Sequence, residues 1–596
     1  MSVFSIKKSN SYKKPDKCLS PSTISNWNKE IAKLSVHEKL NVCSESVFFT
    51  YGIMADESTR GEKKIFLVCF VYWNDKKEEP TLTLVKMKDM DRCTGNEVAN
   101  TVIQTCEEYN FDPKRCNFWL TDNTAYMSGS SSGAIAVFNN LSQTSAHRIP
   151  CGLHSVHIAA NYFENEAYGK LNSPSGLSLQ EHHPSSLLNL AYHLHDGYKD
   201  SDKDNPVNMK SETIQKLYWT LLQYRLNQYQ KPITSRWLYQ LKTGEQYLER
   251  KEFHLKFASW FIPQIENSKN APKNYIKKWK VFLNWLQDPL LNLQVKSMVK
   301  FGQRFYAKVF SFLTGYDATP RILQNGISIH LPPGNRAHEL PDQVLSWLSE
   351  LQKVIESPNY YFADELNEAN SILSEDESQN FCSKLNLGIK KSLESFSKWM
   401  ECWIHLPLSV CRLGGDHGPE FARAIAFVIM NYTFEINPSW YETSYIKILK
   451  EDLSKEKKES FGLFEALKEN DFTEQFLAFA GSQTADLVKY PLVYDFVKYR
   501  IWPIIVHQQQ IEGAFNKYDI RTDPNQSKAL QEARMQLTCS TIEDITITRK
   551  TLSEVRKEIK GKGIVKECEE FGEEVAKEIL RVYLVPKKLI YYIYIY

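Results

Sequence analysis

The N-terminal third of the chain alternates short apolar runs with polar turns, which is the pattern of strands in a sheet. The runs are rich in Phe, Val, Ile, Tyr and Thr, which favour strands. We predict strands at 47–54, 65–73, 81–87 and 117–121. Asn74 and Asp75, with the Lys/Glu cluster after them, are typical of a turn between the second and third runs.

Between the third and fourth runs the period changes to that of a helix. One helical face is formed by Val98, Val102, Cys106 and Tyr109, and Asp112-Pro113 ends the segment. A second helix is expected over 134–141, then a short strand over 148–150 and a helix carrying His154 and His157. The order strand, strand, strand, helix, strand predicts an α/β layer with a mixed sheet.

From about 165 to 490 the apolar positions follow the helical period, and strand alternation is missing. One such face contains Val344, Trp347, Leu348, Leu351, Val354 and Ile355. With 596 residues the chain exceeds the roughly 250 to 300 that one core supports. We therefore predict a fold class of α/β plus all-α, with a separate helical unit.

The two ends of the chain have patterns of their own. Residues 1–40, rich in Lys, Ser and Pro, predict a mobile polar arm. A late helix is predicted to begin at Pro503, with Ile511, Phe515 and Tyr518 on one face and Glu512 about 100° round from Ile511. Residues beyond about 540 predict a charged helical tail.

Composition restricts the partners without choosing one. Lys plus Arg (73) nearly balances Asp plus Glu (71), so contact with DNA requires local basic patches. Twelve cysteines without a C-x-x-C pair favour free thiols over a zinc ribbon or a disulfide framework. The longest apolar run, 65–73, is about half of a membrane helix. We expect a soluble intracellular protein that does not engage a membrane.

Three carboxylates carry the candidate chemistry. Asp56 follows the first predicted strand, Asp122 follows the fourth, and Glu512 lies on the late helix. Carboxylates at the ends of such elements suit two divalent cations, Mg²⁺ or Mn²⁺, in phosphodiester chemistry. The alternative is that the aspartates are ordinary turn residues and Glu512 an exposed helical glutamate.

Two further groups of residues have both a functional and a structural interpretation. Cys151, His154 and His157 supply three of the four ligands that a zinc site needs, so packing or substrate positioning is favoured over zinc. Trp237, next to Arg236, can stack on a base, whereas a tryptophan in a helical unit more often belongs to the core.

The order of these elements and motifs resembles the hAT superfamily of cut-and-paste DNA transposases over roughly residues 45–535. The resemblance implies a ribonuclease-H-like mixed sheet interrupted by a long helical insertion domain. Asp56, in Met54-Ala-Asp-Glu-Ser-Thr59, resembles the first catalytic aspartate, and Asp122, in Thr121-Asp-Asn-Thr-Ala125, resembles the second. Glu512 resembles the glutamate of the C-terminal dimerisation segment, which completes the triad.

The same resemblance assigns DNA contacts. Cys151 and His154 match the family's C-x-x-H element, and Ser235-Arg236-Trp237 resembles its Arg-Trp motif, whose tryptophan holds a flipped base. The implied domains are an arm at 1–40, a first catalytic part at 42–165, a helical insertion at 166–486, a catalytic and dimerisation part at 487–540, and a tail at 541–596.

The sequence departs from the family in two places. Glu512-Gly-Ala-Phe515 replaces the commoner Glu-Arg-x-Phe, and the BED-type zinc finger that many members carry at the front has no counterpart. The expected function is metal-dependent cleavage and transfer of DNA strands by a nuclear homo-oligomer. The alternative is an inactive, domesticated scaffold that binds DNA or dimerises.

Overall fold

We describe the protein from a computed structural model. The described residues run from 45 to 539 with gaps at 61–62, 173–178, 196–210, 233–236, 269–270, 316–320, 323–327, 330, 333, 455–459 and 522–527, and include Lys29, Ala32, Val36, Lys39 and Leu40. The predicted C-terminal tail and most of the N-terminal arm lie outside this range, as does the side chain of Tyr518.

Contacts divide the chain into two compact units. Among the described residues, the sheet unit comprises those up to 148 and those from 508 to 539, and the helical unit comprises those from 149 to 507. The predicted boundaries were 165/166 and 486/487. The first division lies earlier because α5 (Gly152–Tyr168) packs along α14 (Glu375–Met400) of the helical unit. The second lies later because Val506 bonds to Gly334 and Gly152 of that unit.

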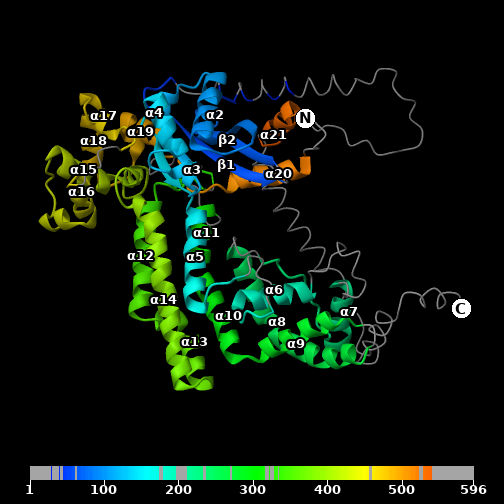
Figure 1. Cartoon of the computed structure of the whole chain (residues 1–596). Coiled ribbons are helices and arrows are strands. Elements are labelled where there is room, and N and C mark those ends of the chain that lie inside the picture. The colour runs from blue at the N-terminus through cyan, green and yellow to red at the C-terminus, as the bar shows by residue number, and fades with distance from the viewer. Residues whose placement is uncertain are drawn as a thin grey trace, which may run out of the picture. The chain divides into compact units, whose positions relative to one another are not determined.

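The sheet unit is built on a five-stranded mixed sheet in the order β3-β2-β1-β4-β5 (Figure 1). The strands are β1 (Tyr51–Arg60), β2 (Lys63–Asn74), β3 (Glu79–Met90), β4 (Cys116–Thr121) and β5 (His147–Pro150). Strands β1, β2 and β3 form antiparallel pairs, and β1 runs parallel to β4. The predicted strands are confirmed as elements, and the mixed α/β sheet is confirmed with them.

Apolar side chains hold this sheet together. In β2 every residue from Ile65 to Trp73 is at most 1% exposed, so both faces of this strand are covered. Gly52 of β1 lies so close to the ring of Phe118 in β4 that a Cβ atom there would overlap it. The first strand begins at Tyr51 rather than at Val47, whose side chain is exposed.

Helices cover the sheet. The chain forms α2 (Gly95–Glu108), α3 (Ala125–Ser128), α4 (Ala134–Ser142), α20 (Gln509–Arg521) and α21 (Lys528–Cys539) in this unit. Helix α2 begins with a capping box, in which Thr94 and Glu97 each accept the other's backbone N–H. It packs on α4, while α20 packs on β1 and α21 on β3.

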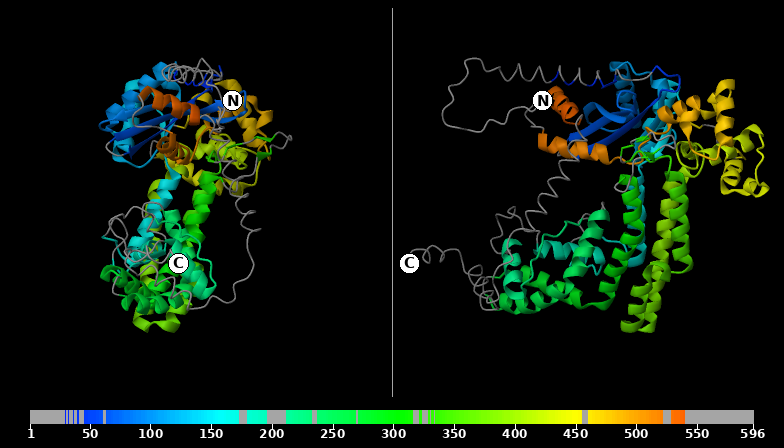
Figure 2. Two further views of the ribbon diagram at one scale, coloured as in Figure 1. Left: turned by 90° about the vertical axis from the view of Figure 1, so that its right-hand side faces the viewer. Right: turned by 180° about the vertical axis from the view of Figure 1, so that it is seen from behind.

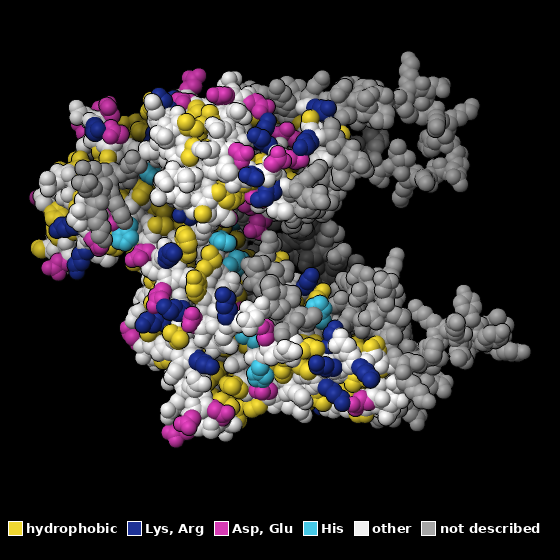
Figure 3. All heavy atoms as spheres, in the orientation of Figure 1, with side chains coloured by type: hydrophobic (Ala, Val, Ile, Leu, Met, Phe, Trp, Pro, Cys, Tyr) yellow, Lys and Arg dark blue, Asp and Glu magenta, His cyan; other side chains and the backbone are white. Residues whose placement is uncertain are grey.

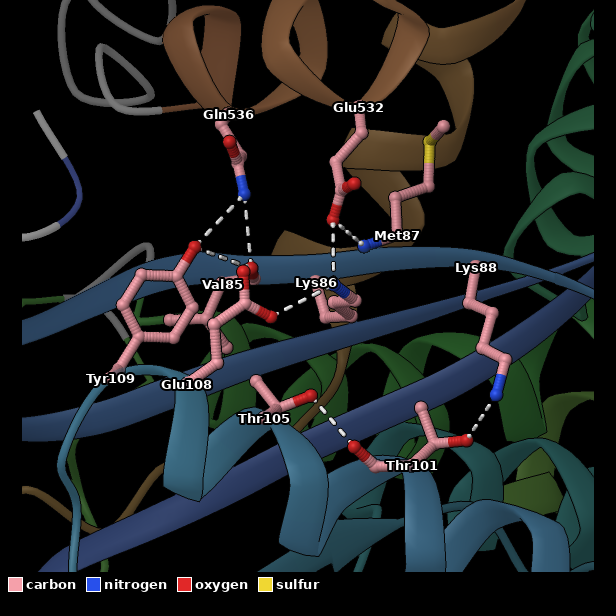
Figure 4. Close-up of polar contacts among 10 residues, drawn as sticks. All are labelled: Val85, Lys86, Met87, Lys88, Thr101, Thr105, Glu108, Tyr109, Glu532 and Gln536. Atoms are coloured by element: carbon pink, nitrogen blue, oxygen red, sulfur yellow. Dashed lines mark hydrogen bonds and ion pairs between the residues drawn. The ribbon is translucent and has the colours of Figure 1, made fainter. Parts of the chain in front are cut away.

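Helix α21 closes the outer edge of the sheet (Figure 4). The carboxylate of Glu532 accepts the backbone N–H of Met87 at 3.1 Å and pairs with Lys86 at 3.8 Å. The side-chain amide of Gln536 donates to the carbonyl oxygen of Val85 at 3.0 Å. Since no strand in the described part of the chain pairs with this side of β3, these two side chains take the place of a neighbouring strand.

The helical unit is confirmed as mostly α-helical. Besides α5 and α14 it contains α6 (Pro184–His195), α7 (Ser211–Leu222), α8 (Trp237–Glu266), α9 (Lys273–Gln287), α10 (Pro289–Phe301), α11 (Ala307–Thr314), α12 (Leu340–Glu356), α13 (Asn359–Ile372), α15 (Gly418–Met430), α16 (Ser444–Ser454), α17 (Leu463–Ala466), α18 (Asn470–Gly481) and α19 (Pro491–Arg500). Two short strands, β6 (Arg321–Ile322) and β7 (Ser328–Ile329), form a hairpin that the sequence did not predict.

Within this unit α5 and α14 run side by side (Figure 2). Gly388 of α14 lies against the backbone of Phe163 and the Cβ atom of Ala167, so the two helices approach closely there. Of the helices in the described part of the chain, none is long and apolar enough to span a membrane.

Candidate active site

The three predicted carboxylates all belong to the sheet unit. Asp56 lies in β1, Asp122 directly follows β4, and Glu512 lies in the first turn of α20. Strands β1 and β4 are neighbours, with Met54 beside Leu120 as the last pair in register. Both aspartates therefore follow the same end of a parallel pair, two residues beyond Met54 and Leu120 respectively.

The pKa of Asp56 is set mainly by burial and, to a smaller extent, by the charges of the other two carboxylates. Burial raises the pKa of Asp56 from 3.8 to about 8, and the negative charges of Asp122 and Glu512 contribute to that rise. The backbone N–H of Glu57 donates to Asp56 Oδ1 at 2.8 Å, and this hydrogen bond lowers the pKa of Asp56. Burial disfavours the ionised form of Asp56 most, and the like charges of the two other carboxylates add to this effect.

Strand β1 does not end before Asp56, as the sequence suggested, but continues to Arg60. Its pairing with β2 persists there, with Asp56 beside Leu67. Its register with β4 stops at Met54. Asp56 is thus part of a regular strand, at the point where one of the two neighbouring strands has ended.

Asp122 is fixed by a local turn. Its Oδ1 accepts the hydroxyl of Thr124 at 2.7 Å and the backbone N–H of the same residue at 3.2 Å. The next residue, Asn123, accepts an N–H of the Arg148 guanidinium at 2.6 Å. These bonds orient the Asp122 carboxylate and tie the end of β4 to β5.

Glu512 lies on a helix whose apolar side faces the sheet unit. Ile511 is 0% exposed and Phe515 is 3% exposed, whereas Glu512 is exposed. This agrees with the angular separation predicted between Ile511 and Glu512. The helix begins at Gln509 rather than at Pro503, because Asn335 donates to the carbonyl oxygens of Trp502 and Pro503, outside any helix.

The donor set fits magnesium or manganese in its chemistry. Carboxylate oxygens are the ligands that such hard cations take, and their mutual repulsion is relieved by a divalent charge. Among the described residues, however, no group of three His, Cys, Asp or Glu side chains lies close enough together to hold a metal ion. The carboxylates are close enough to shift one pKa without yet forming a coordination shell.

The other predicted site residues belong to the helical unit. Cys151 is buried at the start of α5, His154 is exposed one turn later, and His157 is partly buried. His157 Nδ1 accepts the backbone N–H of Trp237 at 3.3 Å and bonds to the Tyr306 hydroxyl at 2.9 Å. These contacts give His157 a structural role in joining α5 to the start of α8.

Trp237 lies in the interior of the helical unit. It is 0% exposed, and its indole N–H donates to Glu164 Oε2 at 2.9 Å. A base can stack on this indole only after the side chain leaves the core, so this conformation gives Trp237 its structural role. Ser235 and Arg236 lie outside the described residues.

Two contributors to the site were missed by the sequence interpretation. Gln508, placed only within a Gln-rich segment, bridges β1 and β4, and Arg148 holds Asn123. A run of three glutamines does not indicate which one turns inward. The proximity of Arg148 to Asn123 depends on the pairing of β4 with β5.

No protein-family model matches the chain, and no curated protein matches its sequence.

Proposed function

We propose that this chain is a hAT-like transposase or a protein derived from one, which cleaves DNA strands and joins 3′-hydroxyl ends to DNA with the help of divalent metal ions. The observation that carries the proposal is that Asp56 and Asp122, far apart in sequence, lie on or directly after the parallel neighbours β1 and β4, while Glu512 lies on α20, which packs on β1. A charged cluster of this kind is costly unless a cation uses it.

The fold supports the same proposal. A ribonuclease-H-like domain, as implied by the resemblance, needs its first and fourth strands side by side so that its two aspartates meet. Here β1 and β4 are parallel neighbours. The third carboxylate arrives on α20, after the long helical segment, in the order that the resemblance implies.

In this proposal Asp56, Asp122 and Glu512 hold the metal ions, Mg²⁺ or Mn²⁺. Bound there, such ions activate the attacking oxygen and stabilise the leaving oxygen in phosphodiester cleavage. The bonds from Thr124 keep the Asp122 carboxylate oriented, and the partial burial of Asp56 limits the access of water to one side of the cluster.

DNA is the proposed partner, and helix α9 offers a surface for its phosphates. Lys273, Lys277 and Lys280 are exposed and recur at helical spacing, and Lys280 also pairs with Glu266. Figure 3 shows basic side chains gathered over α9. Because the net charge is only +2, contact with DNA requires a local basic patch, and these lysines form one.

Nicking of supercoiled plasmid in Mn²⁺ tests the catalytic proposal. We expect the wild-type protein to nick the plasmid and the Asp122→Asn variant to lose at least about a hundredfold in rate, since a neutral amide does not balance the metal charge. Asp471→Asn, on the exposed first turn of α18, is the control and should leave the rate unchanged. Equal nicking by Asp122→Asn and wild type would refute the assignment.

A non-catalytic DNA-binding scaffold is the second candidate. It is favoured by the absence, in the described part of the chain, of a closed three-ligand group, and by the buried position of Trp237. A scaffold should bind DNA equally well with Asp122→Asn and show no Mn²⁺-dependent nicking with either protein.

Self-association and a nuclear location remain predictions of the resemblance. The apolar residues 487–506, at the start of the predicted dimerisation part, pack inside one chain: Leu487, Val493, Phe496, Val497, Ile501, Trp502, Ile504 and Val506 are each at most 1% exposed. Light scattering at micromolar concentration tests for the oligomer, and a strict monomer would count against it.

A further inference from the structure

We infer that Gln508 is a positioning residue that sets the place of Glu512 relative to the two aspartates. The inference rests on the proposed function, because it assigns Gln508 a part in the same carboxylate site. It concerns a residue that touches neither DNA nor metal and acts only through the backbone of its neighbours.

The side chain of Gln508 joins the two strands that carry the aspartates. Its Nε2 donates to the carbonyl oxygen of Ala55 at 3.0 Å and to that of Leu120 at 3.4 Å. Ala55 directly precedes Asp56, and Leu120 precedes Asp122 by two residues. The amide therefore bridges β1 and β4 just where their ladder ends, after Met54 and Leu120.

The backbone of the same residue begins the helix that carries the third carboxylate. The carbonyl oxygen of Gln508 accepts the N–H of Glu512 at 3.1 Å and the N–H of Ile511 at 3.1 Å. One residue thus contacts the backbone next to all three carboxylates. Its side chain is 4% exposed, so these hydrogen bonds are made away from solvent, where an unmade bond is costly.

A link of this kind matters because metal ligands tolerate little displacement. Ligand geometry has to be held within about 0.5 Å, and residues that support ligands typically contribute about 10- to 100-fold to metal affinity. Glu512 lies on an exposed helical turn that has no strand to hold it, unlike Asp56. In addition to the packing of α20 on β1, the Gln508 amide ties the residue before this helix directly to both strands.

The chain contains a matched control for this role in Gln536. Its Nε2 also donates to a carbonyl oxygen of the sheet, that of Val85, at 3.0 Å, and has a second acceptor in the Tyr109 hydroxyl at 3.5 Å (Figure 4). It is 8% exposed. Both glutamines thus tie the C-terminal helices to the sheet, but only Gln508 does so beside the carboxylates.

The test compares Gln508→Met with Gln536→Met in the full chain, since methionine keeps the length of glutamine and removes its donors. Two quantities are measured: Mn²⁺ affinity by calorimetry, and hydrogen exchange of peptides covering 508–521 and 528–539. We expect Gln508→Met to lose at least tenfold in Mn²⁺ affinity and to exchange faster in 508–521. Gln536→Met should exchange faster in 528–539 and bind Mn²⁺ like the wild type.

The outcomes separate this inference from the function on which it rests. Wild-type Mn²⁺ affinity in Gln508→Met, or an equal loss in both variants, would overturn the positioning role while leaving the metal site in place. If the wild-type protein binds no Mn²⁺, the proposed function fails. Hydrogen exchange of the peptide 508–521 then decides whether Gln508 links the helix to the two strands. Faster exchange of 508–521 in Gln508→Met only would then uphold the link, and unchanged exchange would overturn it.

Discussion

A carboxylate in the interior of the helical unit and one in the sheet unit have different electrostatic surroundings. In the helical unit, Asp452 is 0% exposed and is bonded to His405 Nδ1 at 2.8 Å and to the backbone N–H of Leu406 at 2.8 Å. In the sheet unit, the charges that shift the pKa of Asp56 are those of other carboxylates. A buried carboxylate surrounded by donors serves the fold, whereas one surrounded by like charges points to a ligand.

The same contrast extends to other groups of the helical unit. Glu164 accepts the Trp237 indole N–H, and Arg412 donates to Asp342 Oδ1 at 2.8 Å. His254 lies between the hydroxyls of Tyr218 and Tyr229, at 2.7 and 2.5 Å. These buried groups of the helical unit each have an oppositely charged or hydrogen-bonding partner, whereas the charges beside Asp56 include those of Asp122 and Glu512.

The largest expected effect comes from breaking one of the matched pairs. Asp452→Ala should destabilise the helical unit by about 3 kcal/mol, because the Leu406 N–H and the His405 ring lose their acceptor inside the fold. Hydrogen exchange of the peptide 444–454 measures this as faster exchange. A change below about 1 kcal/mol would show that the pair contributes little to stability.

A smaller change in stability is expected from Asp56→Asn in the sheet unit, and this substitution should stabilise the unit rather than destabilise it. The folded chain keeps a proton on Asp56 up to about pH 8, while an unfolded chain releases it near the ordinary pKa of 3.8. The folded state therefore binds the extra proton between these values, and its stability falls as the pH rises from about 4 to 8. In the absence of metal, Asp56→Asn should remove this dependence and stabilise the sheet unit by about 1 to 3 kcal/mol at pH 8.

Thermal unfolding of wild type and Asp56→Asn in a metal chelator, from pH 5 to pH 8, measures the difference. Its growth with pH is the expected result. Parallel curves for the two proteins, or a wild type that gains stability relative to the variant as the pH rises, would contradict the raised pKa of Asp56.

The smallest effect concerns DNA affinity and its dependence on salt. Replacing Lys273 and Lys277 by Gln should reduce the slope of log affinity against log salt concentration by about 1.8, since each phosphate contact contributes about 0.9. Fluorescence anisotropy with a duplex at several salt concentrations measures it. The control replaces Lys468, in the turn after α17, and Lys391, on α14, which pair with Glu465 and Glu394. An equal loss in both variants would exclude α9 as a DNA surface.

Much of the sheet was predictable because its strands carry long apolar runs between clear turns. The two ends of the first strand, β1, could not be predicted in this way. The polar residues 56–60 look like a turn after the first run, yet they continue as strand because β2 pairs with each of them. At the other end, Phe49 and Phe48 bond back to Ser46, which makes a turn where Val47 predicted a strand.

The candidate site, too, could be predicted only in part from the sequence. Asp56, Asp122 and Glu512 could be chosen from residue type, order and resemblance, but their mutual proximity depends on contacts between β1, β4 and α20. Pro503 favours the start of a helix locally, and the bonds from Asn335 override that preference. The inward position of Gln508, rather than of Gln509 or Gln510, is likewise decided by tertiary packing.

Calorimetric titration of Mn²⁺ into the wild-type protein and the Asp122→Asn variant tests the central claim most directly, since it needs no knowledge of a DNA sequence. We predict binding by the wild type that is lost in Asp122→Asn and retained in Asp471→Asn. Absence of binding by the wild type, or equal binding by wild type and Asp122→Asn, would contradict a metal site built from the three carboxylates.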